Sequence, residues 1–368
     1  MRRRQSSPII AVLTVLHHSA AAQPFYPFFP TRSVTVLDGH AWSFGFNASF
    51  GDALGHVNVA AVPTPERGLV PSAFDVAEPG VVGRRGTAFY RRAFSLPKGR
   101  RGRLLFAACS FFCRVFIDGA EQGSGHYGGG YAPFWVEVPP SESREKRELL
   151  VLADNRWNKT TAPVHTGGDF YMYGGLTRSV VLHTLPPDDA EGAPAPHVEF
   201  IGVLALNLTH INVTVTLSGG LPTRPELVTL AFDRASSASA SVRVPGAGGT
   251  ATAAAVAVPR PKAWHPSSPN LHTVRATVVS SGDAVIARFG LRTVGVTADG
   301  RLSLNGAELR LKGINRHTMT AASGSALTLA EVERDVALLR QLGVNYVRGA
   351  HYPQDQRFLD LCDQEGLL

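Results

Sequence analysis

The hydrophobic and polar positions of this chain follow two different periods. From residue 33 to about 185, short apolar runs rich in β-branched and aromatic residues are separated by Gly and Pro. One of these runs ends at Asp118-Gly119, a dipeptide typical of hairpin turns. From 197 to 293 apolar and polar residues alternate, for example at 211–216. Alternation with a period of two is typical of strands, so we expect antiparallel β-structure over the first 290 or so residues.

The period changes after residue 300. Thr328 and Glu331 form a capping box, and the apolar positions that follow keep helical spacing up to Gly343. A second helical segment ends before Gly366. We therefore predict two strand–helix pairs, the start of a parallel α/β unit. The elements are a strand at 309–315, a helix at 328–342, a strand at 344–348 and a helix at 354–365.

These patterns predict a multidomain chain of β plus α/β class. Residues 23–185 are expected to form an antiparallel sandwich or jelly roll, and 186–196 is a linker rich in Pro, Asp and Gly. Residues 197–293 have the size of an immunoglobulin-like sandwich. Residues 294–368 begin the α/β part.

The first 22 residues have the composition of a secretory leader. Three arginines precede a nine-residue apolar core, and three alanines at 20–22 offer a cleavage site. The core is too short to cross a bilayer, and no later stretch is long enough. We therefore expect a signal peptide at 1–22, an extracellular protein and no membrane partner.

Sequons and cysteines bear on the same expectation. Four Asn-X-Ser/Thr triplets are candidates for N-glycosylation: Asn47, Asn158, Asn207 and Asn212. Cys109 and Cys113 lie four residues apart on what we predict to be one extended strand, which is too far for a disulfide. Both are therefore expected to be buried, small apolar side chains.

The positive charge does not indicate a nucleic-acid partner. The formal net charge is +7, but the basic residues occur in short scattered pairs with one run at 98–103. They are not interleaved with aromatic residues as a base-stacking surface would be. A solvated loop is the better interpretation of that run, and we expect no nucleic-acid binding.

Several distinctive motifs follow one another along the chain. The strongest are LKGINRH at 311–317 and NYVRGAHYP at 345–353, followed by LCDQEG at 361–366. Other segments are LDGHAWSF (37–44), GTAFYRRAF (86–94), GHYGGGYAPF (125–134), WHPSSPN (264–270) and FGLRTV (289–294). In this order and spacing, the motifs resemble glycoside hydrolase family 2, the family of β-glucuronidases and β-galactosidases. DFYMYGGLTRSV at 169–180 resembles the end of the sugar-binding domain in β-glucuronidases.

The resemblance implies a jelly roll, an immunoglobulin-like sandwich and then a (β/α)8 TIM barrel, of which 294–368 is the truncated start. It implies a carbohydrate substrate, no cofactor and no metal, and it leaves a homo-oligomer open for the full-length enzyme. In such barrels the site lies at the carboxyl ends of the strands.

The resemblance also assigns site residues. Asp169 and His351 match sugar-contacting positions, whereas the residues alone are more typical of a turn aspartate and a loop histidine. Asn315, Arg316 and His317 after the first strand, and Arg348 and His351 after the second, are all expected to face the site. Asn315, His317 and Arg348 are expected to support it.

The chemistry of retaining glycosidases requires two carboxylates about 5 Å apart. In this family both are glutamates on later barrel strands, whereas Glu331, Glu333 and Glu365 lie on predicted outer helices. We therefore expect no catalytic residue in this chain. The predicted function is that of a retaining β-glucuronidase-like hydrolase, represented by a fragment that is inactive alone. The alternatives are a β-galactosidase of the same family and a non-catalytic carbohydrate-binding protein.

Overall fold

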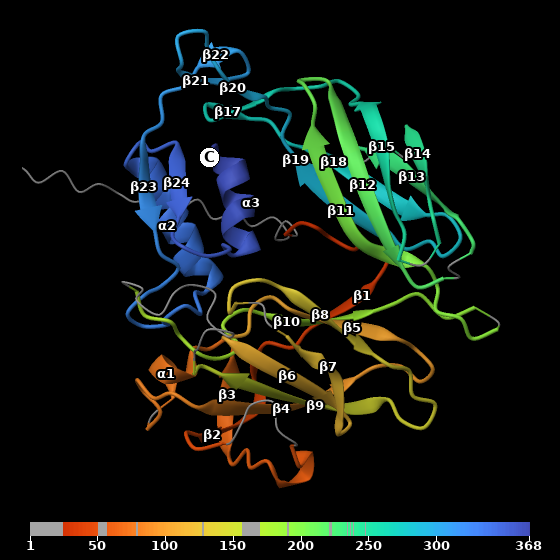
Figure 1. Ribbon diagram of the computed structural model, residues 1–368, viewed down its shortest axis with the longest axis vertical. Coiled ribbons are helices and arrows are strands. Elements are labelled where there is room, and N and C mark those ends of the chain that lie inside the picture. Colours follow the sequence, from red (N-terminus) through yellow and green to blue (C-terminus); the bar gives the residue numbers. More distant parts are fainter. Residues whose placement is uncertain are drawn as a thin grey trace, which may run out of the picture.

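The structure is a computed structural model (Figure 1). It describes residues 25–50, 57–78, 80–126, 129–156, 170–189, 191–220, 223–233, 235, 237, 239–246 and 248–368. The predicted leader at 1–22, the sequon Asn158 and the candidate site residue Asp169 lie outside the described residues.

The first part of the chain forms two antiparallel sheets that share one core. The sheet orders are β1-β10-β5-β8 and β3-β2-β4-β9-β6-β7. Trp42 and Tyr90 from one sheet and Phe106 from the other are fully buried in this core. The elements are β1 (Ser33–Val36), β2 (Gly39–Asn47), η1 (Val59–Ala61), β3 (Glu66–Val70), α1 (Phe74–Ala77), β4 (Thr87–Ser95), β5 (Gly102–Phe106), β6 (Phe112–Ile117), β7 (Ala120–His126), β8 (Phe134–Val138), β9 (Lys146–Asp154) and β10 (Val180–Thr184).

The second part is again a pair of sheets, ordered β11-β12-β15 and β14-β13-β18-β19. The predicted alternation is confirmed in β12, where every second residue from Ile211 to Leu217 is buried in the shared core. The elements are β11 (His197–Ala205), β12 (His210–Ser218), β13 (Glu226–Phe232), β14 (Ala240–Val244), β15 (Thr250–Ala257), β16 (Trp264–His265), β17 (Ser268–Pro269), β18 (His272–Val278) and β19 (Ala284–Phe289).

The third part contains the two predicted strand–helix pairs. Thr328 and Glu331 make both hydrogen bonds of the capping box, and the second helix ends at Gly366 in the left-handed conformation. Both strands are shorter than predicted: the first begins four residues later, the second begins two residues later, and each ends one residue later. The elements are β20 (Val294–Val296), β21 (Leu302–Leu304), β22 (Ala307–Glu308), β23 (Gly313–Arg316), α2 (Leu329–Gln341), β24 (Tyr346–Gly349) and α3 (Gln356–Glu365).

The prediction that Cys109 and Cys113 cannot pair was wrong. They form a disulfide with a Cα–Cα distance of 6.3 Å. Strand β5 ends at Phe106 and β6 begins at Phe112, so Cys109 lies in the connection rather than on an extended strand. The chain turns there and brings the two side chains together. Both are buried, as predicted.

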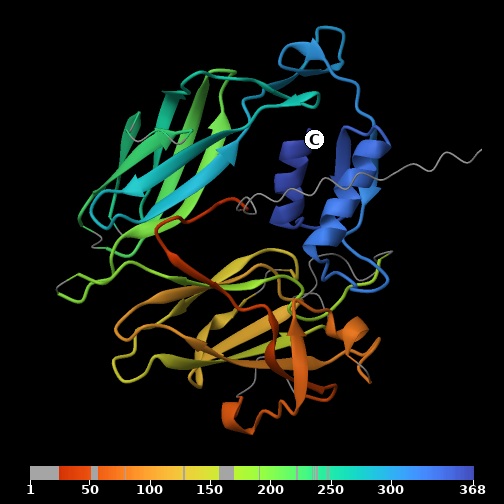
Figure 2. The ribbon, with the colours of Figure 1, turned by 180° about the vertical axis from the view of Figure 1, so that it is seen from behind.

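The N-terminal segment joins the first two parts (Figure 2). Phe28 pairs with Ile286 of β19, and Phe29 packs into the core of the second part. The guanidinium of Arg32 donates to both carboxylate oxygens of Asp283, at 2.9 and 2.8 Å, with both side chains almost fully buried. Because an unpaired charge would be costly there, this ion pair fixes how the segment enters β1.

We expect the stability of this junction to depend on pH through His183 of β10. Burial, together with the charges of Arg32 and Arg103 and partly offset by Asp283, lowers the pKa of His183 from 6.5 to about 4. A histidine with a depressed pKa binds its proton more readily in the unfolded chain. Its contribution to the free energy of unfolding is therefore complete above pH 6.5 and is lost as the pH falls toward 4, by up to about 3 kcal/mol.

Chemical denaturation at a series of pH values checks this. His183→Leu should show a shallower loss of stability between pH 6.5 and 4 than the wild type. The exposed His40 on β2 provides the control, and His40→Leu should retain the wild-type slope. Parallel curves for His183→Leu and the wild type would contradict the assignment.

Candidate active site

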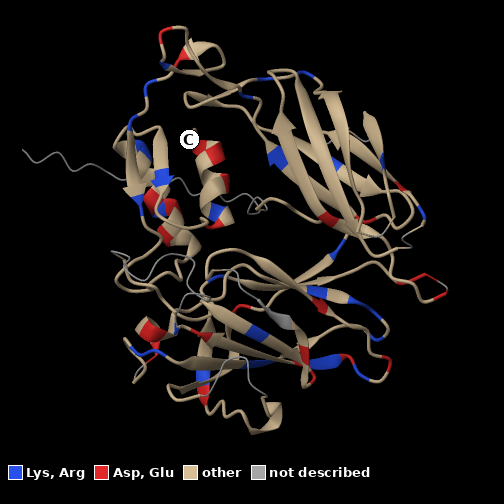
Figure 3. Cartoon of the chain, viewed as in Figure 1, with Lys and Arg blue, Asp and Glu red and all other residues tan. Residues whose placement is uncertain are grey.

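The candidate site lies where two parallel strands end. Strands β23 and β24 pair in parallel, with Asn315 opposite Arg348. Arg348 Nη1 lies 3.5 Å from Asn315 Oδ1, and both side chains are exposed. Helices α2 and α3 follow the two strands, and Figure 3 shows acidic residues on both helices. The carboxyl ends of parallel strands are where α/β barrels place their chemistry.

Two histidines follow these strand ends and face each other. The rings of His317 and His351 are edge-to-face, with centroids 5.1 Å apart. The ring of Phe170, from the first part of the chain, lies 5.2 Å from His317 and 5.8 Å from His351. His351 is exposed and His317 is half-buried. An exposed imidazole beside an aromatic ring can exchange hydrogen bonds with a polar ligand while the ring contacts the ligand's C–H groups.

Arg316, between Asn315 and His317, was expected to face the site, but its side chain points the other way. Arg316 is buried, and its guanidinium donates to Asp335 of α2 at 2.6 Å and lies 4.1 Å from the ring centroid of Phe358 in α3. Since side chains alternate along a strand, Asn315 and His317 share the opposite face. Arg316 therefore anchors the strand to both helices. Asn315 and His317 remain on the opposite face, at the end of the strand.

A stacked tyrosine pair connects this segment to the first part. The rings of Tyr131 and Tyr352 are nearly parallel, with centroids 3.8 Å apart. The hydroxyl of Tyr352 accepts a hydrogen bond from the backbone N–H of Thr318 at 2.9 Å. Burial raises the pKa of Tyr352, so the hydroxyl stays protonated. The pair fixes the loops after both strands.

Arg178 also holds together the two segments that carry the stacked tyrosines. Its guanidinium donates to the carbonyl of Tyr131 at 2.7 Å and to the carbonyl of Pro353 at 3.1 Å. It also lies 3.8 Å from Asp355, the N-cap of α3. One buried side chain thus joins the first part to the second strand–helix pair.

Of the predicted site residues, the structure brings together Asn315, His317, Arg348 and His351, while Asp169 is not described. Sequence reasoning missed four of the residues that hold them, Tyr131, Phe170, Arg178 and Tyr352, and it misassigned a fifth, Arg316, to the site face. All five belong to the motifs at 125–134, 169–180, 311–317 and 345–353. The sequence therefore contained a signal for these residues, but it did not show which residues they contact.

The glutamates predicted to be structural lie on the helices, Glu331 and Glu333 on α2 and Glu365 on α3. Burial raises the pKa of Glu331, but hydrogen bonds from Thr328, Thr320 and Ser323 outweigh it and lower the pKa overall. Among the described residues, no three His, Cys, Asp or Glu side chains gather as metal ligands would. None of the described helices is both long and apolar enough to span a membrane.

Comparison with known proteins agrees with this geometry. Residues 294–368 match the family model of the glycosyl hydrolases family 2 TIM barrel domain. A putative beta-glucuronidase of Formosa agariphila is 26% identical over 330 residues, which are 86% of this chain and 38% of the relative. A Bacteroides fragilis beta-glucuronidase is 30% identical over 302 residues, or 77% of this chain and 43% of the relative.

Among solved structures, a GH2 beta-galacturonidase from Eisenbergiella tayi bound to glycerol superimposes with a TM-score of 0.78 at 27% identity. The match covers 92% of this chain and 57% of that one. The predicted resemblance to glycoside hydrolase family 2 is therefore confirmed: the chain is mostly β and leads into the family's TIM barrel domain. It spans between 38% and 43% of the length of the beta-glucuronidases named above.

Removal of the Tyr352 hydroxyl tests how the site is held. Tyr352→Phe keeps the stacking on Tyr131 but leaves the buried N–H of Thr318 without its acceptor. We expect the free energy of unfolding to fall by about 1–3 kcal/mol in a urea titration. In the control Tyr346→Phe, on β24, the hydroxyl has no partner among the described residues, and the change should stay within about 0.5 kcal/mol. Equal effects of the two changes would contradict a specific role for the Tyr352 hydroxyl.

Proposed function

We propose that this chain is the N-terminal portion of a retaining β-glycoside hydrolase that acts on a β-glucuronide. The observation that carries the proposal is the meeting of His317, His351 and Phe170 at the carboxyl ends of two parallel strands. These strands lie in the segment that matches the family's TIM barrel domain. The first part of the chain thereby supplies one wall of the barrel site.

The exposed residues define what the site offers a sugar. His351 donates or accepts a hydrogen bond at a hydroxyl near the scissile bond, and Asp169 accepts hydrogen bonds from sugar hydroxyls. Asn315, Arg348 and His317 orient these groups. The Asn315–Arg348 contact and the edge-to-face histidines support this division of roles. Each group recognises the substrate, and none of them cleaves the bond.

Bond cleavage in a retaining enzyme takes two carboxylates about 5 Å apart, one as nucleophile and one as acid and base. Among the described residues of the strand–helix pairs, Glu331 caps α2 and Asp335 and Asp355 are paired with arginines. We therefore infer that the catalytic pair comes from barrel strands that this chain does not include.

The choice of β-glucuronide rests on the motif at 169–180 and on the relatives named beta-glucuronidase. A beta-galactosidase from Thermoanaerobacter pseudethanolicus is also similar, at 28% identity, so a β-galactoside is the second candidate. The galacturonidase structure supports a uronic acid over a neutral sugar.

The domain assignment and export belong to the same proposal: a signal peptide at 1–22, a jelly roll at 23–185 and an immunoglobulin-like sandwich at 197–293. The two pairs of sheets support the domains. The Cys109–Cys113 disulfide favours an oxidising, extracellular compartment. Asn47 and Asn207 are exposed as glycan acceptors must be, whereas Asn212 is half-buried and accepts a hydrogen bond from the N–H of Ala255.

Kinetics of the longer enzyme that carries this chain test the proposal. Asp169→Ala and His351→Ala should each lower kcat/KM for a chromogenic β-glucuronide by about tenfold or more, since each removes a hydrogen bond worth about 1–3 kcal/mol. His40→Ala, which alters an exposed histidine of β2, should leave kcat/KM unchanged. Unchanged kinetics in both site variants, or turnover confined to the matched β-galactoside, would contradict the proposed site or substrate. Failure to hydrolyse any glycoside would favour the non-catalytic carbohydrate-binding alternative.

A further inference from the structure

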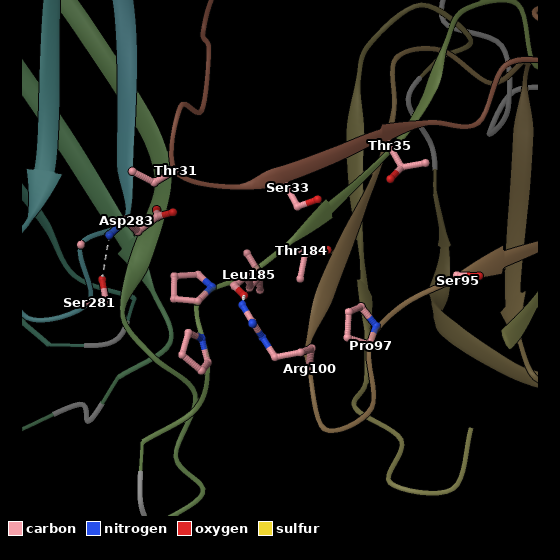
Figure 4. A pocket seen from close by; sticks show the side chains of 13 residues that line it. Thr31, Ser33, Thr35, Ser95, Pro97, Arg100, Thr184, Leu185, Ser281 and Asp283 are labelled. Atoms are coloured by element: carbon pink, nitrogen blue, oxygen red, sulfur yellow. Dashed lines mark hydrogen bonds between the residues drawn. The ribbon is translucent and has the colours of Figure 1, made fainter. Parts of the chain in front are cut away.

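A polar recess lies at the junction of the first two β parts, and none of the candidate active-site residues lines it. It has a volume of about 410 Å³, within the range of small-ligand sites, and opens beside the edge strand β1 (Figure 4). We call it the hydroxyl groove and define it by Ser33, Thr35, Ser95, Arg100, Thr184 and Pro186.

The strand register arranges the hydroxyls of this groove. Ser33 and Thr35 are two residues apart on β1 and so share one face. Thr184 of β10 is directly opposite Ser33. Within the described residues, the hydroxyls of Ser33, Thr35, Ser95 and Thr184 have no protein partner. Each can both donate and accept, which matches the hydroxyls of a sugar.

The groove also holds a positive charge that no carboxylate of the described residues neutralises. In the basic run at 98–103, Arg101 is paired with Asp188 and Arg103 with Glu137 and Glu199. Arg100 has no ion pair among the described residues; its Nη2 donates to the carbonyl of Leu185, and its Nε has no acceptor.

Asp283, the one acidic residue among the described residues that line the recess, does not offset this charge. Both carboxylate oxygens of Asp283 are taken by Arg32, and one of them also accepts the N–H of Val198. Among the described residues, the recess therefore presents a guanidinium without a carboxylate partner beside hydroxyls without a protein partner. A guanidinium with hydroxyl donors around it suits an oxyanion, and Pro186 adds an apolar surface for C–H groups.

We propose that the hydroxyl groove is a non-catalytic binding site for an acidic saccharide unit, a sugar ring that carries a carboxylate or sulfate. Arg100 binds the oxyanion, and the hydroxyls of Ser33, Thr35 and Thr184 bind the ring hydroxyls. The site is built from β1, the end of β4 and the loop after it, and β10 with the residues after it, none of which carries the candidate active-site residues. It would hold a polyanionic substrate chain on the enzyme independently of cleavage.

Equilibrium binding of D-glucuronic acid to the full chain, followed by calorimetry or NMR, tests this proposal. The wild type should bind saturably, and Arg100→Gln should weaken binding at least tenfold. Arg243→Gln removes the same charge from an exposed position on β14 and should have no effect. His351→Ala should leave the Arg100-dependent part of this binding intact, which separates the groove from the candidate active site.

A second variant and a neutral sugar extend this test. Because Arg100 holds the Leu185 carbonyl, the double variant Ser33→Ala/Thr35→Ala offers a second route, since both residues are exposed on the edge strand. The double variant should weaken the binding of glucuronic acid severalfold without loss of thermal stability. D-Glucose should bind more weakly than D-glucuronic acid, and its affinity should be the same for the wild type and for Arg100→Gln. Absence of saturable binding, insensitivity to both groove variants, or equal binding of inorganic sulfate alone would overturn the proposal.

Discussion

The arrangement around the candidate active site depends on the buried guanidinium of Arg178. It satisfies the carbonyls of Tyr131 and Pro353 and lies close to the carboxylate of Asp355. Burial lowers the pKa of Arg178, although Asp355 opposes this. A buried arginine that lost these acceptors would be strongly destabilising. The first β part and the second strand–helix pair are therefore held in one position relative to each other.

That constraint explains how a site forms between segments far apart in the sequence. With the loops fixed, Tyr131 stacks on Tyr352, and Phe170 packs against His317 and His351. Arg316 anchors β23 from the opposite face. The side chains left exposed at the strand ends are those that can contact a ligand. The first part thus acts as a component of the proposed sugar site rather than as an independent appendage.

Local patterns in the sequence were sufficient to predict most of the strands and helices and part of the candidate site. Alternation predicted the β parts, and the capping box and Gly366 predicted the helices. The motif around Asn315 and His317 placed both residues at the strand end. What could not be predicted depends on contacts across long sequence separations, such as the Tyr131–Tyr352 stack. The Cys109–Cys113 disulfide was missed for a local reason, because the sequence does not show where β5 stops and the chain turns.

The most direct test of the central claim is a crystal structure of the longer enzyme with a bound uronic acid at the barrel. The claim is that one sugar site is shared by the first part and the strand ends. It predicts that a ring hydroxyl lies within hydrogen-bonding distance of His351 and that the same ring contacts Phe170. A sugar bound at the barrel without contact to Phe170 or any other residue of the first part would contradict it.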